Sequence, residues 1–117
     1  MILITKDNKI SVGELTKMSE KMFGGLVKAV VDVEKGIMAV DAEFHSDEET
    51  FLMGSGSKRV GVWGINLHPA LFGKDGFIEF DSMINLKSFI GNHTRGVDDQ
   101  KIKEKIIEIV NNLVIPS

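Results

Sequence analysis

The chain has 117 residues, of which 43% are hydrophobic and 26% are charged, and it contains no cysteine. This composition excludes a disordered chain, and the missing cysteines exclude disulfides, thiol catalysis and cysteine-ligated zinc. The net charge of −3 argues against nucleic acid as a partner, because phosphate binding favours a basic surface. We expect residues 1–117 to form a single domain, since chains divide into separate cores only beyond roughly 250 residues.

The expected location follows from the same composition. No apolar run approaches the roughly 18 residues that a membrane span requires, so a membrane is not an expected partner. No signal-peptide pattern opens the chain, and a protein without cysteine suits a reducing compartment. The sequence therefore predicts a cytoplasmic protein.

The first predicted elements are an extended segment and a helix. Met1–Thr5 is apolar and β-branched, which is typical of a short strand or an extended arm. A helix is predicted over Ser11–Phe23, because Ser11 and Glu14 have the capping-box spacing and apolar residues recur every three or four positions. The pair of glycines that follows is expected to end this helix.

The clearest local pattern is a β-hairpin. Apolar and polar residues alternate through Leu26–Glu34 and again through Ile37–His45, as expected for two half-buried strands. Lys35 and Gly36 lie between them, where glycine favours a tight turn. Antiparallel pairing of the two segments is therefore expected.

The middle of the chain permits more than one interpretation. Ser46–Ser57 could begin as a helix with an acidic first turn, or it could contain a short strand at Thr50–Met53 before a flexible glycine–serine loop. Alternation predicts two further strands, Val60–His68 and Phe77–Leu86, and Pro69 is expected to end the first of them.

The last predicted elements are a loop and a helix, and they complete the fold class. Lys87–Gly96 is polar and predicts a loop, whereas Asp98–Val114 has one apolar stripe and an aspartate positioned to cap a helix. The sequence thus predicts an α+β fold. We expect a two-layer sandwich, in which a mainly antiparallel sheet of four or five strands carries both helices on one face.

A candidate site follows from the alternation. If the apolar residues of the strands share one sheet face, the polar residues share the other. Six such positions would bring carboxylate, imidazole and amide groups together: Glu43, His45, Asn66, His68, Asp81 and Asn85. These groups suit a metal such as Zn, Mn, Mg or Fe, although a solvated sheet face is polar in any case. The pattern identifies no particular metal or cofactor.

A second candidate lies in the loop before the last helix. Asn92 and Arg95 offer amide and guanidinium donors, which suit a phosphate or a carboxylate. The alternative is a loop whose side chains satisfy its own backbone.

Several segments together resemble a family of short prokaryotic proteins of unknown function. The segments are Val27–Asp32, Ala42–Asp47, Trp63–Leu67 and Glu79–Asn85, with Gly91, Asn92 and Arg95 before the last helix. The resemblance covers nearly the whole chain. It implies a stand-alone cytosolic protein, and it supplies no activity, cofactor or catalytic residue.

Two functions fit these observations. The first is a small binding or interaction module that associates with itself as a homo-oligomer, because a one-sided sheet leaves a face and an edge available. The alternative is a metal-dependent hydrolase that uses the polar sheet face. An enzyme would gather its titratable groups in a concave pocket, whereas an interaction module would leave them spread over a surface.

Overall fold

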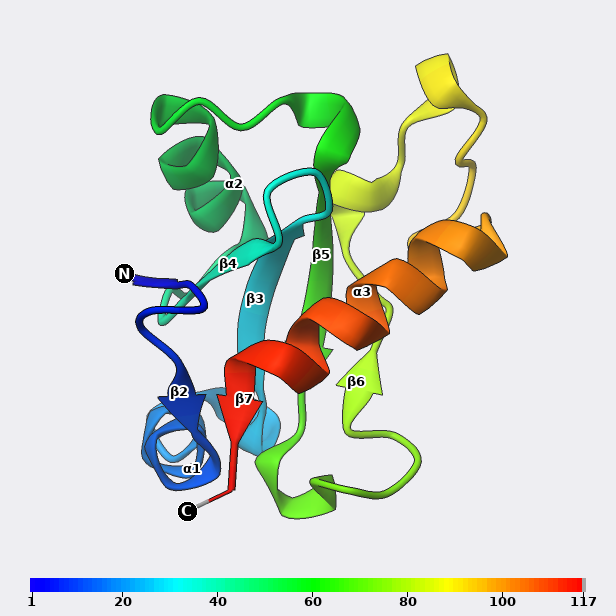
Figure 1. The fold of residues 1–117 in the computed structure, drawn as a ribbon. Helices are drawn as coiled ribbons and strands as arrows, with labels where there is room; N and C mark the ends of the chain where they lie inside the picture. The colour runs from blue at the N-terminus through cyan, green and yellow to red at the C-terminus, as the bar shows by residue number, and fades with distance from the viewer. Residues whose placement is uncertain (117) are drawn as a thin grey trace.

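The computed structural model describes residues 1–116, apart from the side chain of Phe23 (Figure 1). Its centre is an antiparallel sheet with the strand order β1-β4-β3-β5-β6. These strands are β1 (Ile2–Ile4), β3 (Val27–Asp32), β4 (Ile37–Val40), β5 (Val62–Leu67) and β6 (Ile78–Glu79). The helices are α1 (Val12–Ser19), α2 (His45–Gly54) and α3 (Gln100–Leu113). The predicted α+β fold with an antiparallel sheet is confirmed.

The predicted hairpin is also confirmed. β3 and β4 pair antiparallel, with Val31 opposite Met38. Gly36 in the connecting turn has a φ of 68°, a left-handed conformation that a glycine adopts without strain.

Local capping sets the beginnings of two helices. In the capping box of α1, the Glu14 amide donates to Ser11 Oγ at 3.1 Å, and the Ser11 amide donates to Glu14 Oε1 at 3.3 Å. Asp99 caps α3, because its Oδ1 accepts a hydrogen bond from the Lys101 amide at 2.8 Å. The predicted helix Ser11–Phe23 is too long, because α1 ends at Ser19 and the chain then tightens into turns before the glycines.

A second, two-stranded sheet joins distant parts of the chain. β2 (Ile10–Ser11) precedes α1, β7 (Val114–Ile115) follows α3, and the two strands pair in parallel. This pairing was not predicted. Two-residue strands carry too short a pattern to be recognised from sequence.

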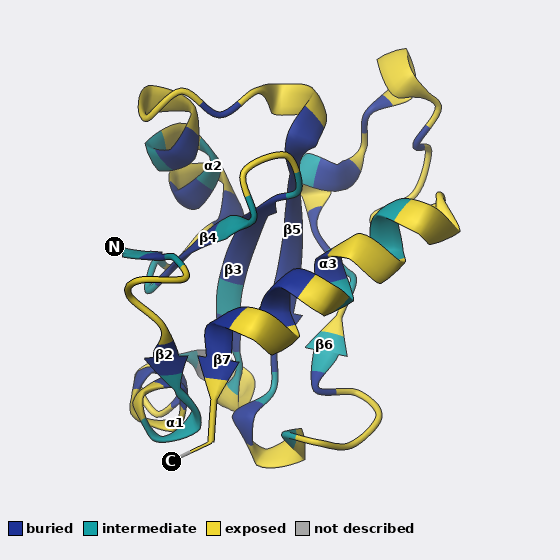
Figure 2. Cartoon of the chain, viewed as in Figure 1, coloured by how far each residue is buried: buried dark blue, intermediate teal, exposed yellow. Residues whose placement is uncertain are grey.

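The central sheet is covered on both faces. Alternate strand residues, including Val31 and Ile65, share one core cluster with Leu15 of α1 and Ile106 of α3. The opposite alternation gives a second cluster in which Leu52 of α2 packs with strand residues on that face. Figure 2 shows buried positions in α2 as well as in the strands. The expected two-layer sandwich therefore needs correction, because α2 adds a layer on the face that was expected to be polar and solvated.

Two predicted strands are shorter than their alternation suggested. Ile37–His45 leaves the sheet after Val40, because Asp41 has a φ of 70° and the chain turns into α2. Phe77–Leu86 keeps only β6 in the sheet. The segment after β6 instead forms the 3-10 helix η4 (Met83–Asn85), and Ser82 Oγ accepts from the Ile84 amide at its start. Glu43, His45 and Asn85 are consequently not strand residues.

The α3 side of the core gives a direct test of the packing. Ile106 is fully buried in the larger cluster, so Ile106→Ala should lower the free energy of unfolding by about 2–5 kcal/mol. Urea denaturation measures this loss. The matched control is Ile90→Ala, because Ile90 is 42% exposed and should lose much less. Equal losses in the two variants would contradict the burial of Ile106.

No helix in residues 1–116 is both long enough and apolar enough to cross a membrane.

Candidate functional site

A cavity of about 340 Å³ opens where the start of α2 faces the ends of β5 and β6. Its polar lining comes from five parts of the chain: Lys28, His45 with Ser46, Asn66, Asp81 with Ser82, and Arg95. The sheet brings three of these parts together. Lys28 on β3 lies opposite Asn66 on β5, and Asn66 lies opposite Glu79 at the end of β6, just before Asp81. The cavity is therefore assembled by strand pairing and completed by α2 and by the loop before α3.

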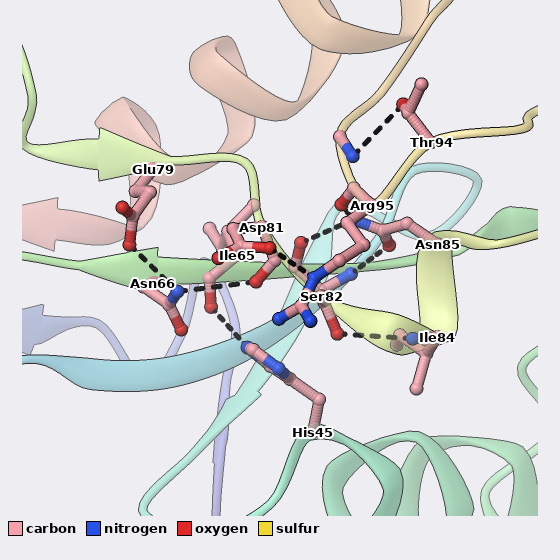
Figure 3. Close-up of polar contacts among 12 residues, drawn as sticks. His45, Ile65, Asn66, Glu79, Asp81, Ser82, Ile84, Asn85, Thr94 and Arg95 are labelled. Atoms are coloured by element: carbon pink, nitrogen blue, oxygen red, sulfur yellow. Dashed lines mark hydrogen bonds and ion pairs between the residues drawn. The ribbon is translucent and has the colours of Figure 1, made fainter.

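His45, the first residue of α2, is held by the neighbouring strand. Its Nε2 lies 2.7 Å from the backbone oxygen of Ile65 (Figure 3). Because a carbonyl oxygen can only accept, Nε2 carries the proton in this contact. Burial lowers the pKa of His45, although the Ile65 carbonyl opposes the shift. The ring is thus held as the neutral tautomer protonated on Nε2.

Asn66 links the cavity to an acidic residue outside it. Its Nδ2 donates to Glu79 Oε1 at 2.9 Å and to the backbone oxygen of Asp81 at 3.3 Å (Figure 3). The same Glu79 oxygen lies 3.2 Å from Nε2 of His68. These contacts lower the pKa of Glu79, with the Asn66 hydrogen bond as the main cause and the His68 hydrogen bond second.

Arg95 and Asp81 form an ion pair at the mouth of the cavity. Arg95 Nε lies 2.6 Å from Asp81 Oδ1, and both side chains are about half exposed. The guanidinium of Arg95 extends from Asp81 towards His45 in Figure 3. Only Nε is used in this bond, so the terminal nitrogens of the guanidinium remain able to donate to a bound group.

The whole of this region lies within one sequence family. A family model described as "Protein of unknown function (DUF5674)" matches residues 3–113. The chain belongs to this family. The match confirms the family resemblance seen in the sequence, and it includes every residue that lines the cavity. No curated protein and no solved structure matches the chain.

The six predicted site residues of this DUF5674 member have different positions. His45, Asn66 and Asp81 line the cavity, and His68 is linked to it indirectly, through Glu79 and then Asn66. Glu43 is exposed on the loop before α2, where it lines a neighbouring cavity with Lys28 and Phe44. Asn85 is fully buried and lies against the edge of β5, outside the cavity lining.

Asn85 completes the edge of β5 where β6 has ended. Its Oδ1 accepts from the Gly64 amide at 2.8 Å, and its Nδ2 donates to the Gly64 and Arg95 carbonyls at 2.9 Å each. Gly64 is required by the close packing here, because an added Cβ would lie 2.5 Å from Ser82 Oγ. Asn85 therefore fixes the backbone that carries Arg95.

The two predicted anion-binding residues are also separated. Asn92 is buried and directed at its own loop: its Nδ2 donates to the carbonyls of Asn85, Thr94 and Gly96, and its Oδ1 accepts from the Asp98 amide. Arg95 lines the cavity. The sequence prediction of the site omitted Lys28 and Glu79. Strand alternation could have identified both residues, because they lie opposite Asn66 on paired strands and so share its sheet face.

The metal hypothesis needs a group of ligands converging on one point. Within residues 1–116, no group of three or more His, Cys, Asp or Glu side chains is placed to hold a metal ion. His45, Asn66 and Asp81 line the cavity, whereas Glu43, His68 and Asn85 do not.

Proposed function

We propose that this protein is a binding module for a small anionic molecule, and that the cavity beside α2 is its binding site. The observation that carries the proposal is the pair of cationic side chains, Lys28 and Arg95, which come from segments far apart in the sequence and line the same cavity. The ion pair with Asp81 uses only Nε of Arg95, so its terminal nitrogens can donate to a bound anion. Asn66 is 6% exposed and forms a fixed part of the cavity wall, because Glu79 and the Asp81 backbone hold its Nδ2.

The charges of the cavity support an anion as that ligand. Two cationic side chains, Lys28 and Arg95, line it with one carboxylate, Asp81, and the buried His45 is neutral. The cavity also adjoins the beginning of α2, where Phe44 occupies the N-cap position and no described side chain caps the helix. Helix amide groups left uncapped add to the attraction for an anion.

The rim of the cavity carries large apolar side chains that are exposed to solvent. Phe44 and Met83 are 56% and 63% exposed, and both line the cavity. Large apolar side chains with this exposure commonly mark a binding surface. A polar floor with an apolar rim is the arrangement expected of a small-molecule site.

Removal of the Arg95 charge tests the proposal. We expect wild-type protein to bind acetate or inorganic phosphate with shifts in the amide NMR signals of residues around the cavity. Arg95→Gln should weaken this binding about tenfold or more, because charge-assisted hydrogen bonds to the anion are lost.

The sequence offers a matched control, because arginine occurs only at Arg59 and Arg95. Arg59 contacts the ring of Phe89 and does not line the cavity, so Arg59→Gln changes the net charge equally without touching the site. Equal losses in the two variants would indicate a nonspecific charge effect and contradict the proposed site.

Self-association and metal-dependent hydrolysis stay as further hypotheses.

Self-association by strand pairing at the β1 edge is restricted. This edge has three residues, and Asn8 Nδ2 already donates to the Leu3 carbonyl at 2.9 Å. Light scattering measures the mass in solution, and titration with Zn²⁺ or Mn²⁺ tests the metal alternative.

A further inference from the structure

We infer that the ligand of this cavity is a small α-hydroxy carboxylate, with its carboxylate at Arg95 and its hydroxyl donating a hydrogen bond to Nδ1 of His45. This inference rests on the proposed function and adds the chemical class of the ligand.

The orientation of His45 determines what the imidazole can do. Since Nε2 donates to the Ile65 carbonyl, Nδ1 of the neutral ring carries the lone pair and can only accept. Among the described residues, Nδ1 receives no hydrogen bond, although the side chain lines the cavity. A ligand that presents a donor beside Nδ1 can therefore form a hydrogen bond to it.

Asn66 does not compete for that donor. Its Nδ2 is occupied by Glu79 and by the Asp81 backbone, and its Oδ1 is enclosed by the protein, out of reach of a ligand. The cavity thus combines one unpaired acceptor, Nδ1 of His45, with the cationic groups of Lys28 and Arg95. Its ligand should carry a hydrogen-bond donor beside an anionic group.

The donor is better supplied by a hydroxyl than by an ammonium group. Lys28 and Arg95 place two positive charges on the lining against the single negative charge of Asp81. The ammonium group of a ligand would therefore be repelled. The available space limits the rest of the molecule. About 340 Å³ corresponds to roughly ten water molecules, so the cavity has room for a ligand of at most about ten non-hydrogen atoms.

Three probes of nearly equal size test this inference: lactate, propionate and alanine. Lactate and propionate differ by the hydroxyl, and alanine replaces the hydroxyl with an ammonium group. Titrations followed by amide NMR signals should show lactate binding about fivefold more tightly than propionate, which corresponds to one hydrogen bond, and alanine binding more weakly than lactate.

Variants of His45 assign the preference to its Nδ1. His45→Phe removes the acceptor and should bind lactate and propionate equally. His45→Asn offers a carbonyl oxygen near the position of Nδ1 and should keep part of the preference. Circular dichroism verifies that each variant is folded. The wild-type protein gives an independent measurement, because the imidazole Nδ1 signal should shift on adding lactate and stay in place on adding propionate.

The outcomes separate the two proposals. If none of the three probes binds to the wild-type protein, the proposed anion site is itself wrong. If lactate and propionate bind equally and Arg95→Gln weakens both, the anion site stands and the hydroxy-carboxylate inference is overturned. A lactate preference that persists in His45→Phe would also overturn it.

Discussion

Replacing Glu48 with glutamine should make the protein progressively more stable than the wild type as the pH rises from about 4.5 towards 9. Glu48 is fully buried on α2, and its carboxyl group makes no ion pair and no hydrogen bond with another side chain among the described residues. Burial raises the pKa of this carboxyl to about 9, and the Ala42 backbone and the Lys28 charge oppose the shift only in part.

The direction of this pH dependence follows from the number of protons that the folded and unfolded states bind. Between an unfolded pKa near 4.5 and a folded pKa of about 9, the folded protein holds a proton that the unfolded chain releases. The free energy of unfolding therefore falls as the pH rises through this window, by at most about 1.4 kcal/mol per pH unit. Glutamine has no such proton, so Glu48→Gln should match the wild type near pH 4 and exceed its stability by a few kcal/mol at pH 8.

Urea denaturation at several pH values measures this difference. The control is Glu104→Gln, because Glu104 is exposed on α3 and its replacement should shift the whole curve by a small, nearly constant amount. Parallel curves for the wild type and Glu48→Gln would mean that the Glu48 carboxyl reaches solvent in the folded protein.

Asn85→Ala should lower the free energy of unfolding by about 2–5 kcal/mol, because a buried side chain with three backbone hydrogen bonds is lost. The amide and carbonyl of Gly64 would then be left without partners inside the protein. The same change should weaken anion binding, since the Asn85 amide also holds the backbone of Arg95.

Asn112→Ala provides the comparison for this variant. Asn112 is exposed on α3, where alanine has the higher helix propensity, so its replacement should change stability by less than about 1 kcal/mol. Thermal or urea unfolding of both variants gives the two losses. A loss at Asn85 as small as that at Asn112 would be incompatible with the hydrogen bonds assigned to it.

The features that could be predicted from sequence are those fixed by neighbouring residues. The capping box of Ser11 and Glu14 depends on a three-residue spacing, and the β3–β4 turn depends on Gly36. The end of β6 depends instead on a residue of another segment, because Asn85 takes over hydrogen bonds to Gly64 that a longer strand would make. Alternation alone therefore extended this strand too far.

Helix α2 was ambiguous for a different reason. Its core-facing side chains are His45, Glu48 and Leu52, so the buried side of the helix is mostly titratable. A pattern search that looks for apolar residues at helical spacing cannot recognise such a stripe. The free-energy cost of burying Glu48 is compensated by packing of the sheet face beneath it, which no local pattern reveals.

The candidate site was predicted in part, and partly for a wrong reason. Asn66 was placed correctly by strand alternation, whereas His45 was expected on a strand and lies instead at the start of α2. It still faces Asn66, because α2 folds back over the polar end of the sheet. The contribution of Arg95 could not be placed from the sequence, since its position depends on the hydrogen bonds of Asn85 and Asn92 in a long loop.

The parallel pairing of β2 with β7 has a consequence for local opening of the molecule. Segments that flank the first and last helices of a domain commonly fray, because little holds them. Here Ile10 pairs with Val114, about 100 positions further along the chain, and both side chains are buried. Fraying of the segment before α1 therefore removes the partner of the segment after α3. The two segments are coupled into one cooperative unit, whose amide hydrogens should exchange with solvent together.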